Sequence, residues 1–181
     1  LLSCDIPGRN FNRKDSLVEH LEDCQRMNLE VVPPDVNTSE AEFAVANGKI
    51  YFGLVAVKGC GGSAAEAVVA ARKKHGPFRS LFDFCERVDP TQCNRASIET
   101  LIKAGAFDSL QAKRSQWLAV LDRALQSGAT ALADRRSGQK SLFGGLADED
   151  SQPAASKLPQ LPELDEREKL LMEKEVLGFY L

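Results

Sequence analysis

Apolar residues recur three or four positions apart in several parts of this chain, the spacing that places them on one face of a helix. In the segment 94–104, for example, Ile98, Leu101 and Ile102 fall on one side. The pattern predicts six helices, over residues 15–28, 63–74, 80–88, 94–104, 109–127 and 164–177. Glycine or Gly-Pro follows several of these segments, as expected where helices end. A mainly α fold is therefore predicted.

A different pattern lies between the first two predicted helices. In FAVANGKIYFGL two apolar runs flank Asn47-Gly48, the residue pair that best tolerates a tight hairpin with positive backbone angles. We expect a small two-stranded ribbon formed by residues 42–46 and 49–53.

The composition changes after Gly128, where small, polar, glycine and proline residues dominate. Such sequences bury too little apolar surface to hold one conformation, so we expect a flexible linker from about residue 144 to 162. The predicted organisation has four parts: a region with the β-hairpin at 1–53, a helical module at 54–128, a linker region at 129–163 and a final helical segment at 164–181.

Charge is unevenly distributed along the 181 residues, although the net charge is only −3. The segment 58–114 has 10 basic and 6 acidic side chains, whereas 146–181 has 4 basic and 9 acidic. This basic middle favours an anionic partner. Five cysteines without a CxxC pair, and two histidines, argue against a metal site or a disulfide framework. Reduced cysteines predict a cytoplasmic protein, and no apolar run is long enough for a membrane span.

The segment AVKGCGGSAAEAVVAARKK places three glycines around one cysteine and then begins a helix. Gly59 and Gly61 are expected to adopt backbone angles that side chains resist. The free amides of the turn and of the helix start would then point outward, which is a ready phosphate site, with Lys58 adding charge. Neither the P-loop spacing nor the dinucleotide-binding spacing is present. A glycine-rich corner without a ligand is the alternative.

A second, weaker copy of the turn occurs in TLIKAGAFDSL, residues 100–110. Phe107 stands where the first copy has Gly61, so this copy is expected to pack rather than to contact phosphate. Two such units in tandem indicate a paired helix-hairpin-helix module, which holds duplex nucleic acid by its backbone without reading sequence.

Several blocks of the chain occur in an order that resembles one family. They are LEDCQRMNLEVVPPDVN, IYFGLVAVKGCGGSAAEAV, GPFRSLFDFCERVD, NRASIETLIKAGAFDSL, GQKSLF and EKEVLGFYL. Together they resemble the bacterial DNA polymerase III alpha subunit, a replicative DNA polymerase. The resemblance implies a fragment that covers the end of the fingers domain in residues 1–53, the tandem helix-hairpin-helix in 54–128, and the region that binds the sliding clamp. A chain that begins at Leu1 and ends at GFYL also suggests a piece of a longer protein.

The resemblance implies that duplex primer-template DNA, the sliding clamp and other replicase subunits are partners. Its DNA-binding residues correspond here to Lys58, Gly59, Gly61, Gly62 and Ser63, with Arg72, Lys73 and Lys74 as flanking phosphate contacts. Its clamp-binding peptide corresponds to QKSLF, in which Gln139, Ser141, Leu142 and Phe143 are the expected contacts. The alternative is that Leu142 and Phe143 pack on the fourth helix of the module.

Catalysis is not expected from these residues. In the family, carboxylates elsewhere hold magnesium, and no cofactor is expected in this part. Asp83, Asp89 and Asp108 are interpreted as caps or solvated groups, so no catalytic or metal-ligating residue is predicted. Two other functions are alternatives. A helix-hairpin-helix repair nuclease or lyase would use Lys58 or an acidic cluster, and a helical protein-interaction scaffold would have no role with DNA.

Overall fold

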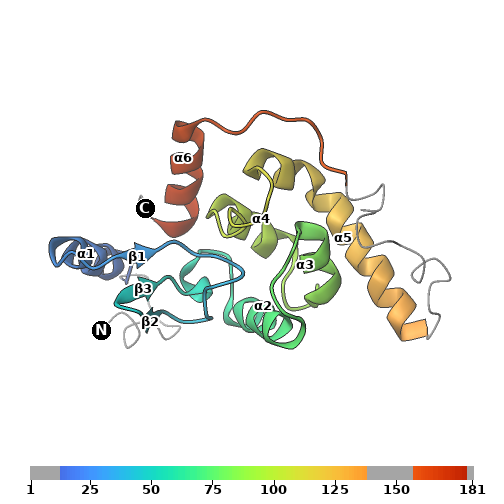
Figure 1. The fold of residues 1–181 in the computed structure, drawn as a ribbon, viewed down its shortest axis with the longest axis horizontal. Coiled ribbons are helices and arrows are strands. Elements are labelled where there is room, and N and C mark those ends of the chain that lie inside the picture. The colour runs from blue at the N-terminus through green and yellow to red at the C-terminus, as the bar shows by residue number, and fades with distance from the viewer. Residues whose placement is uncertain (1–12, 138–156, 179–181) are drawn as a thin grey trace.

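The computed structural model describes residues 13–137 and 157–178, and this part of the chain is mainly helical, as predicted (Figure 1). Its elements in chain order are α1 (Arg13–Arg26), β1 (Val31–Val32), β2 (Ala44–Ala46), β3 (Lys49–Tyr51), the 3-10 helix η1 (Leu54–Ala56), α2 (Gly62–His75), α3 (Leu81–Arg87), α4 (Arg95–Lys103), α5 (Arg114–Ser137) and α6 (Glu166–Leu177). None of these helices is long and apolar enough to cross a membrane.

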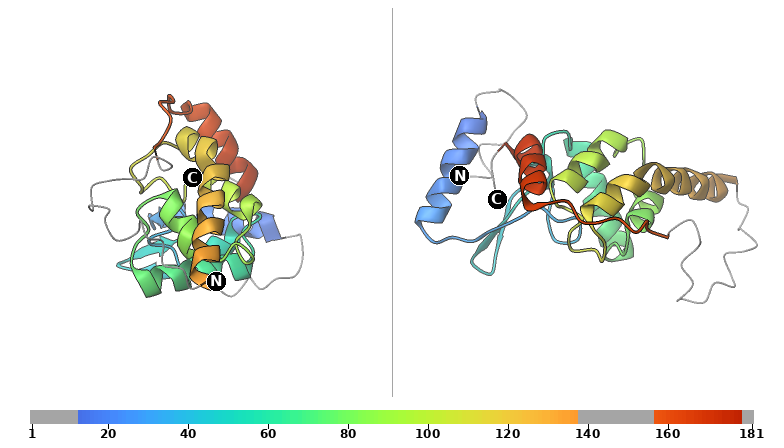
Figure 2. Two further views of the ribbon diagram at one scale, coloured as in Figure 1. Left: turned by 90° about the vertical axis from the view of Figure 1, so that its right-hand side faces the viewer. Right: turned by 90° about the horizontal axis from the view of Figure 1, so that it is seen from above.

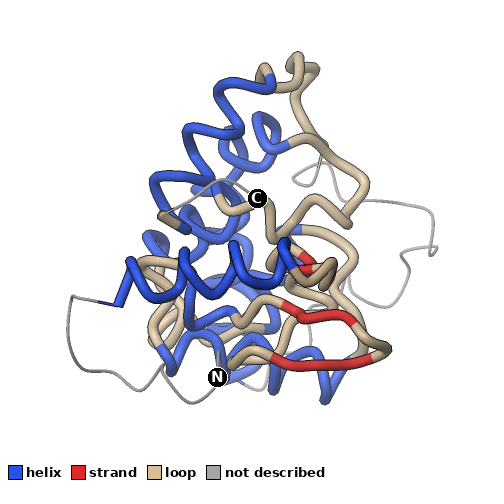
Figure 3. The backbone as a smooth tube through the Cα atoms, turned by 90° about the vertical axis from the view of Figure 1, so that its left-hand side faces the viewer, coloured by secondary structure: helices blue, strands red, loops and turns tan. Residues whose placement is uncertain are grey.

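The predicted β-hairpin is present, but it belongs to a sheet of three strands, not two. β3 lies in the middle, antiparallel to β2 and parallel to β1. Figure 3 draws the strands in red. Asn47 and Gly48 have φ values of 52° and 73°, the left-handed angles that the tight turn requires. The expectation missed β1 because a strand of two valines has no alternating pattern, and it pairs with a segment 19 residues farther along the chain.

The elements lie in an extended arrangement, with α1 and the sheet at one end and the far part of α5 at the other (Figures 1 and 2). Between them, one hydrophobic core joins the sheet to the helices. Phe84 on α3 is fully buried at its centre, with ring centroids 4.9 Å from Phe78 and 5.1 Å from Phe107. These aromatic contacts fix α3 between the loop after α2 and the turn after α4.

Helix α5 differs from the expectation at both ends. It begins at Arg114 instead of residue 109, because residues 104–109 form turns and the Gln116 side chain accepts a hydrogen bond from the Lys113 N–H. It also continues through Gly128 to Ser137, so residues 129–137 are helical rather than part of a linker.

Gly128 does not end the helix, because a neighbouring helix approaches its backbone. A Cβ atom placed on Gly128 would lie 2.3 Å from the Cys85 carbonyl oxygen and 2.7 Å from the Cys85 carbonyl carbon. The missing side chain therefore lets α5 pack directly against the backbone of α3. Glycine is unfavourable inside a helix by about 1 kcal/mol, and here close packing explains its presence.

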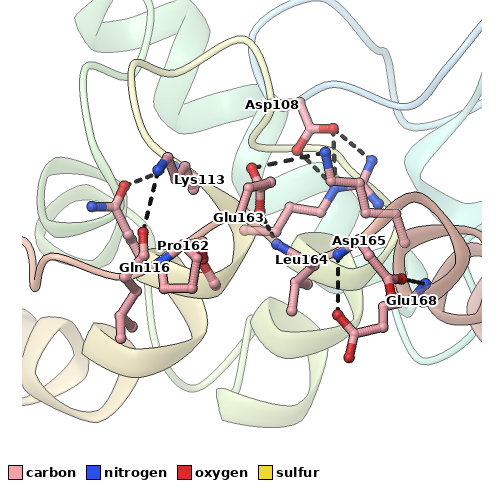
Figure 4. A network of polar contacts seen from close by, with 12 residues as sticks. Asp108, Lys113, Gln116, Pro162, Glu163, Leu164, Asp165 and Glu168 are labelled. Carbon is pink, nitrogen blue, oxygen red and sulfur yellow. Dashed lines mark hydrogen bonds and ion pairs between the residues drawn. The ribbon is translucent and has the colours of Figure 1, made fainter.

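The end of the predicted linker is also ordered by contacts with α5. Residues 157–162 run along this helix, where Arg123 donates to the Lys157 carbonyl at 2.6 Å and Gln116 to the Pro159 carbonyl at 2.8 Å. Ser115 donates to the Pro162 carbonyl at 2.7 Å. Figure 4 shows this end of the segment leading into α6.

Helix α6 begins with a capping box. The Asp165 carboxylate accepts from the Glu168 N–H at 2.6 Å and the Glu168 carboxylate accepts from the Asp165 N–H at 3.1 Å (Figure 4). This reciprocal arrangement satisfies two amides that a helix start leaves unpaired. Gly178, at φ 92°, ends the helix, as the sequence predicted.

The close approach at Gly128 can be tested by adding a single methyl group. We expect Gly128→Ala to lower the free energy of unfolding by about 1–3 kcal/mol, because overpacking against a backbone carbonyl outweighs the gain in helix propensity. Gly62→Ala is the control, since a Cβ there would meet nothing within 4 Å. Urea denaturation of both variants measures the effect, and a Gly128→Ala protein as stable as the wild type would contradict this packing.

Candidate nucleic-acid interface

The first glycine turn, residues 57–61, reverses the chain between η1 and α2. The Cys60 N–H donates to the Val57 carbonyl at 2.9 Å, and Gly59 has a φ of 89°. A turn of this kind needs a positive φ at its third residue, which favours glycine. The expectation was therefore right for Gly59. It was wrong for Gly61, whose φ of −70° and ψ of 164° are extended angles that any residue can adopt.

Gly61 does not shape the turn but is the residue that directly precedes α2. No side chain caps this helix, and its first residues lack an acidic group. Gly61, Gly62 and Ser63 are all exposed, and a Cβ on either glycine would meet nothing within 4 Å. The first amides of a helix have no partner within the helix, and they form its positive end. Here they are open to a ligand, as an anion site requires.

Lys58 contributes its side chain to this site but not its amide. The Lys58 N–H donates to the Val176 carbonyl at the end of α6, at 2.8 Å. The side chain is exposed, and its ammonium group makes no ion pair with any side chain that the structure describes. An anion that binds here would therefore contact the charge of Lys58 and the exposed amides of residues 61–63.

The turn is held from below by α4. Ser97, which is 6% exposed, donates its hydroxyl to the Gly59 carbonyl at 2.9 Å. A Cβ on Gly59 would lie 3.1 Å from the Thr100 methyl carbon, so glycine also allows close contact with this helix. Cys60 points into the core with 2% exposure, and burial raises the pKa of its thiol to about 11. The thiol therefore stays neutral and serves as a small apolar group.

The second hairpin, between α4 and α5, is closed rather than open. Gly105 has a φ of 81°, but Ala106 and Phe107 are fully buried, as the sequence predicted for this copy. The Arg114 side chain lies against Gly105 and pairs with Asp108. A carboxylate and a buried arginine therefore stand where the first hairpin has exposed amides.

Arg114 also fastens this hairpin to α6. Its side chain is 7% exposed, and it lies 2.8 Å from the Glu173 carboxylate as well as 2.9 Å from Asp108. Burial lowers the pKa of Arg114, but the hydrogen bonds and charges of the two carboxylates outweigh burial and raise it. Lys103 adds a contact of 3.5 Å with Glu175. No sequence pattern indicated the two pairs with α6, because their members are 59 and 72 positions apart.

The predicted flanking contacts do not lie beside the turn. Arg72, Lys73 and Lys74 occupy the last turn of α2, roughly 16 Å along the helix axis from its start. Arg72 is 10% exposed, donating to the Val36 and Ser39 carbonyls at 3.0 and 2.7 Å and pairing with Glu40. Arg72 thus joins α2 to the loop before the hairpin, and this use argues against it as a phosphate contact.

The other two members of this group differ from Arg72. Lys73 is exposed and pairs with Glu40 at 3.0 Å, whereas Lys74 is exposed with no ion-pair partner in the described part of the chain.

The predicted clamp-binding residues Gln139, Ser141, Leu142 and Phe143 lie outside the described residues, shortly after α5 ends at Ser137.

The carboxylates considered above have structural partners. Asp83 accepts from the Arg79 N–H and pairs with Arg87, Asp89 accepts from Thr91, and Asp108 pairs with Arg114. Across residues 13–137 and 157–178, no three His, Cys, Asp or Glu side chains are grouped in a way that could hold a metal ion. The described residues therefore do not fit a magnesium site.

Comparison with known proteins agrees with this geometry. A family model described as "Helix-hairpin-helix motif" matches residues 28–117, which include both hairpins, so the chain contains a helix-hairpin-helix module. Among curated proteins, the DNA polymerase III subunit alpha of Deinococcus radiodurans is 41% identical over 170 residues, which cover 92% of this chain and 12% of the relative. The subunit of Pseudomonas aeruginosa is 37% identical over 188 residues, covering 95% and 16%. The chain belongs to the DNA polymerase III alpha family.

The chain matches only part of each relative. The alpha subunit of Caulobacter vibrioides is 38% identical over 175 residues, which cover 95% of this chain and 15% of the relative. The chain thus spans less than a fifth of the length of these relatives, with nearly all its residues in the match.

Proposed function

We propose that this chain holds duplex primer-template DNA by its phosphate backbone, as part of a replicative DNA polymerase that works in the bacterial cytoplasm. The observation that carries the proposal is the open first hairpin, where the uncapped start of α2 is exposed and follows an exposed lysine without an ion pair among the described side chains. The membership in the alpha-subunit family and the helix-hairpin-helix match support it.

Each residue of the turn has a part in this proposal. The amides of Gly61, Gly62 and Ser63 donate to a phosphate oxygen, and the Lys58 ammonium neutralises its charge. Gly59 provides the left-handed angle that shapes the turn. Backbone amides contact phosphates without reading bases, so binding would be independent of sequence.

The second hairpin contributes rigidity in this proposal, not a phosphate contact. Asp108 would repel an anion, and Arg114 is already paired with two carboxylates. Through Arg114 and Lys103, this hairpin fixes α6, whose Val176 carbonyl accepts from the Lys58 N–H of the first turn. The asymmetry of the two hairpins would let one grip DNA while the other supports it.

DNA binding can be tested by reversing the charge of Lys58. In fluorescence anisotropy with a 20-bp duplex at about 50 mM salt, we expect Lys58→Glu to weaken binding about tenfold, which corresponds to about 1.4 kcal/mol. The slope of log K against log salt should also fall by about 1, because one phosphate contact is lost. Arg167→Glu, at an exposed position of α6, is the control because it makes the same change in net charge. Equal weakening by both variants would show a general charge effect and contradict a site at the turn.

The chain is proposed to support DNA synthesis without carrying out the chemistry itself, since the described carboxylates have structural partners and do not fit a magnesium site. In the whole polymerase, magnesium would be held by other residues. We expect the purified chain to extend no primer when supplied with primer-template, nucleotides and magnesium. Primer extension that persists after stringent purification would overturn this part of the proposal.

We also propose that QKSLF binds the bacterial sliding clamp. α5 runs to Ser137, so the peptide follows directly after a helix that is anchored on α3. Leu142 and Phe143 would enter an apolar pocket and the Gln139 amide would fix the register. A short peptide with two apolar anchors binds weakly, because ordering it costs entropy. Simultaneous contacts with DNA and other replicase subunits would raise its effective concentration.

The clamp proposal is tested with the double variant Leu142→Ala/Phe143→Ala. We expect it to lose binding to purified sliding clamp in surface plasmon resonance, since the two apolar anchors supply most of the buried area. Lys140→Ala at a variable position of the peptide is the control and should retain binding. If the double variant binds as well as the wild type, the two residues have a packing role instead.

A further inference from the structure

A second basic surface lies at the opposite end of α2 from the glycine turn. The end of α2, the loop that follows it, α3 and the far part of α5 enclose a hollow of about 630 Å³. Its charged lining consists of Lys74, Arg79, Arg87 and Arg135 against the single carboxylate of Asp83. This volume lies within the range of pockets that hold small ligands, and we call it the α2-end hollow.

The negative end of α2 amounts to about half an elementary charge and would oppose an anion here, but the cations around the hollow exceed it. Arg87 donates to the carbonyls of Gly76 and Pro77, and it pairs with Asp83 at 2.8 Å. Its guanidinium also lies 4.5 Å from the centroid of the Phe78 ring, and the side chain is 11% exposed. Arg87 and Asp83 thus form a neutral pair at the base of the hollow, and Arg87 satisfies the two carbonyls that directly follow the helix.

Besides the neutral pair of Arg87 and Asp83, three cationic side chains line the hollow. Lys74 and Arg79 are exposed, and neither side chain has a carboxylate partner among the side chains that the structure describes. Arg135 donates one guanidinium nitrogen to the Glu86 carbonyl at 2.9 Å, which aims the group without neutralising its charge. Three uncompensated charges from two elements and a loop around one hollow raise the local potential for an anion.

We infer that the α2-end hollow binds a phosphodiester of DNA, as a second backbone contact separate from the glycine turn. Arginine and lysine together suit phosphate, since guanidinium donates two parallel hydrogen bonds and ammonium acts as a point charge. The two sites lie at the two ends of α2, about 20 Å apart for its 14 residues. At 3.4 Å of rise per base pair, that separation is about six base pairs along the duplex axis, so one 20-bp duplex is long enough to span both sites. DNA is favoured over an acidic peptide because this inference rests on the proposed binding of a duplex at the turn.

The test removes two charges at the hollow with little effect on the fold. We expect Lys74→Gln/Arg79→Gln to weaken binding of a 20-bp duplex about fivefold at about 50 mM salt in fluorescence anisotropy. The slope of log K against log salt should fall by about 2, one for each lost contact. Lys157→Gln/Arg167→Gln is the matched control, since it removes two exposed charges elsewhere and should keep the wild-type slope. Equal melting temperatures by circular dichroism establish that the fold of each variant is intact.

The outcomes separate this inference from the proposed function. If Lys58→Glu weakens binding while Lys74→Gln/Arg79→Gln binds as the wild type does, the hollow has no role with DNA and the turn keeps its role. If the hollow variant loses affinity for fluorescent polyglutamate but not for the duplex, the hollow takes an acidic polypeptide and the inference is wrong. A wild-type chain that shows no affinity for the duplex at this salt would overturn both.

Discussion

The left-handed backbone at Gly59 is the constraint on which the first hairpin depends. A φ of 89° lets the chain reverse within four residues, so that the Lys58 side chain is exposed and the Cys60 side chain, two positions later, is buried in the core. The same angle brings the Gly59 carbonyl to Ser97 and the backbone against Thr100 on α4. With the turn fixed in this way, α2 starts at the surface with its first amides exposed. A residue with a Cβ would be strained at this angle and would also press on α4.

The two hairpins show how similar local sequences acquire different roles. Both contain a glycine with a positive φ after a lysine. The first is followed by two more glycines with open space around them, whereas the second is followed by buried Ala106 and Phe107. Arg114 then occupies the space beside Gly105 and joins it to α6. Because the Val176 carbonyl near the end of α6 accepts from the Lys58 N–H, α6 contacts both the closed hairpin and the open one.

The basic residues of the middle segment divide into two groups that charge counting cannot separate. Arg72, Arg87 and Arg114 are almost buried, and they satisfy backbone carbonyls and carboxylates within the fold. Lys58 and Lys74 remain exposed at the two ends of α2. The net excess of positive charge in the segment predicted an anionic partner, and it counted both groups together. Which cations are free to meet that partner depends on neighbours that are distant in sequence.

The sequence by itself determined the elements that rest on local physics. Helical spacing of apolar residues located six helices, Asn47-Gly48 located the hairpin, and the glycines of residues 59–62 located the tight turn before α2. Tertiary structure decided the rest. The strand β1 exists because β3 offers it a partner, and α5 passes through Gly128 because a bare backbone is needed against Cys85. The contact of Val176 with Lys58 likewise joins segments 118 positions apart. Short-range periodicity carries no information on such contacts, because they arise only when separate elements pack against one another.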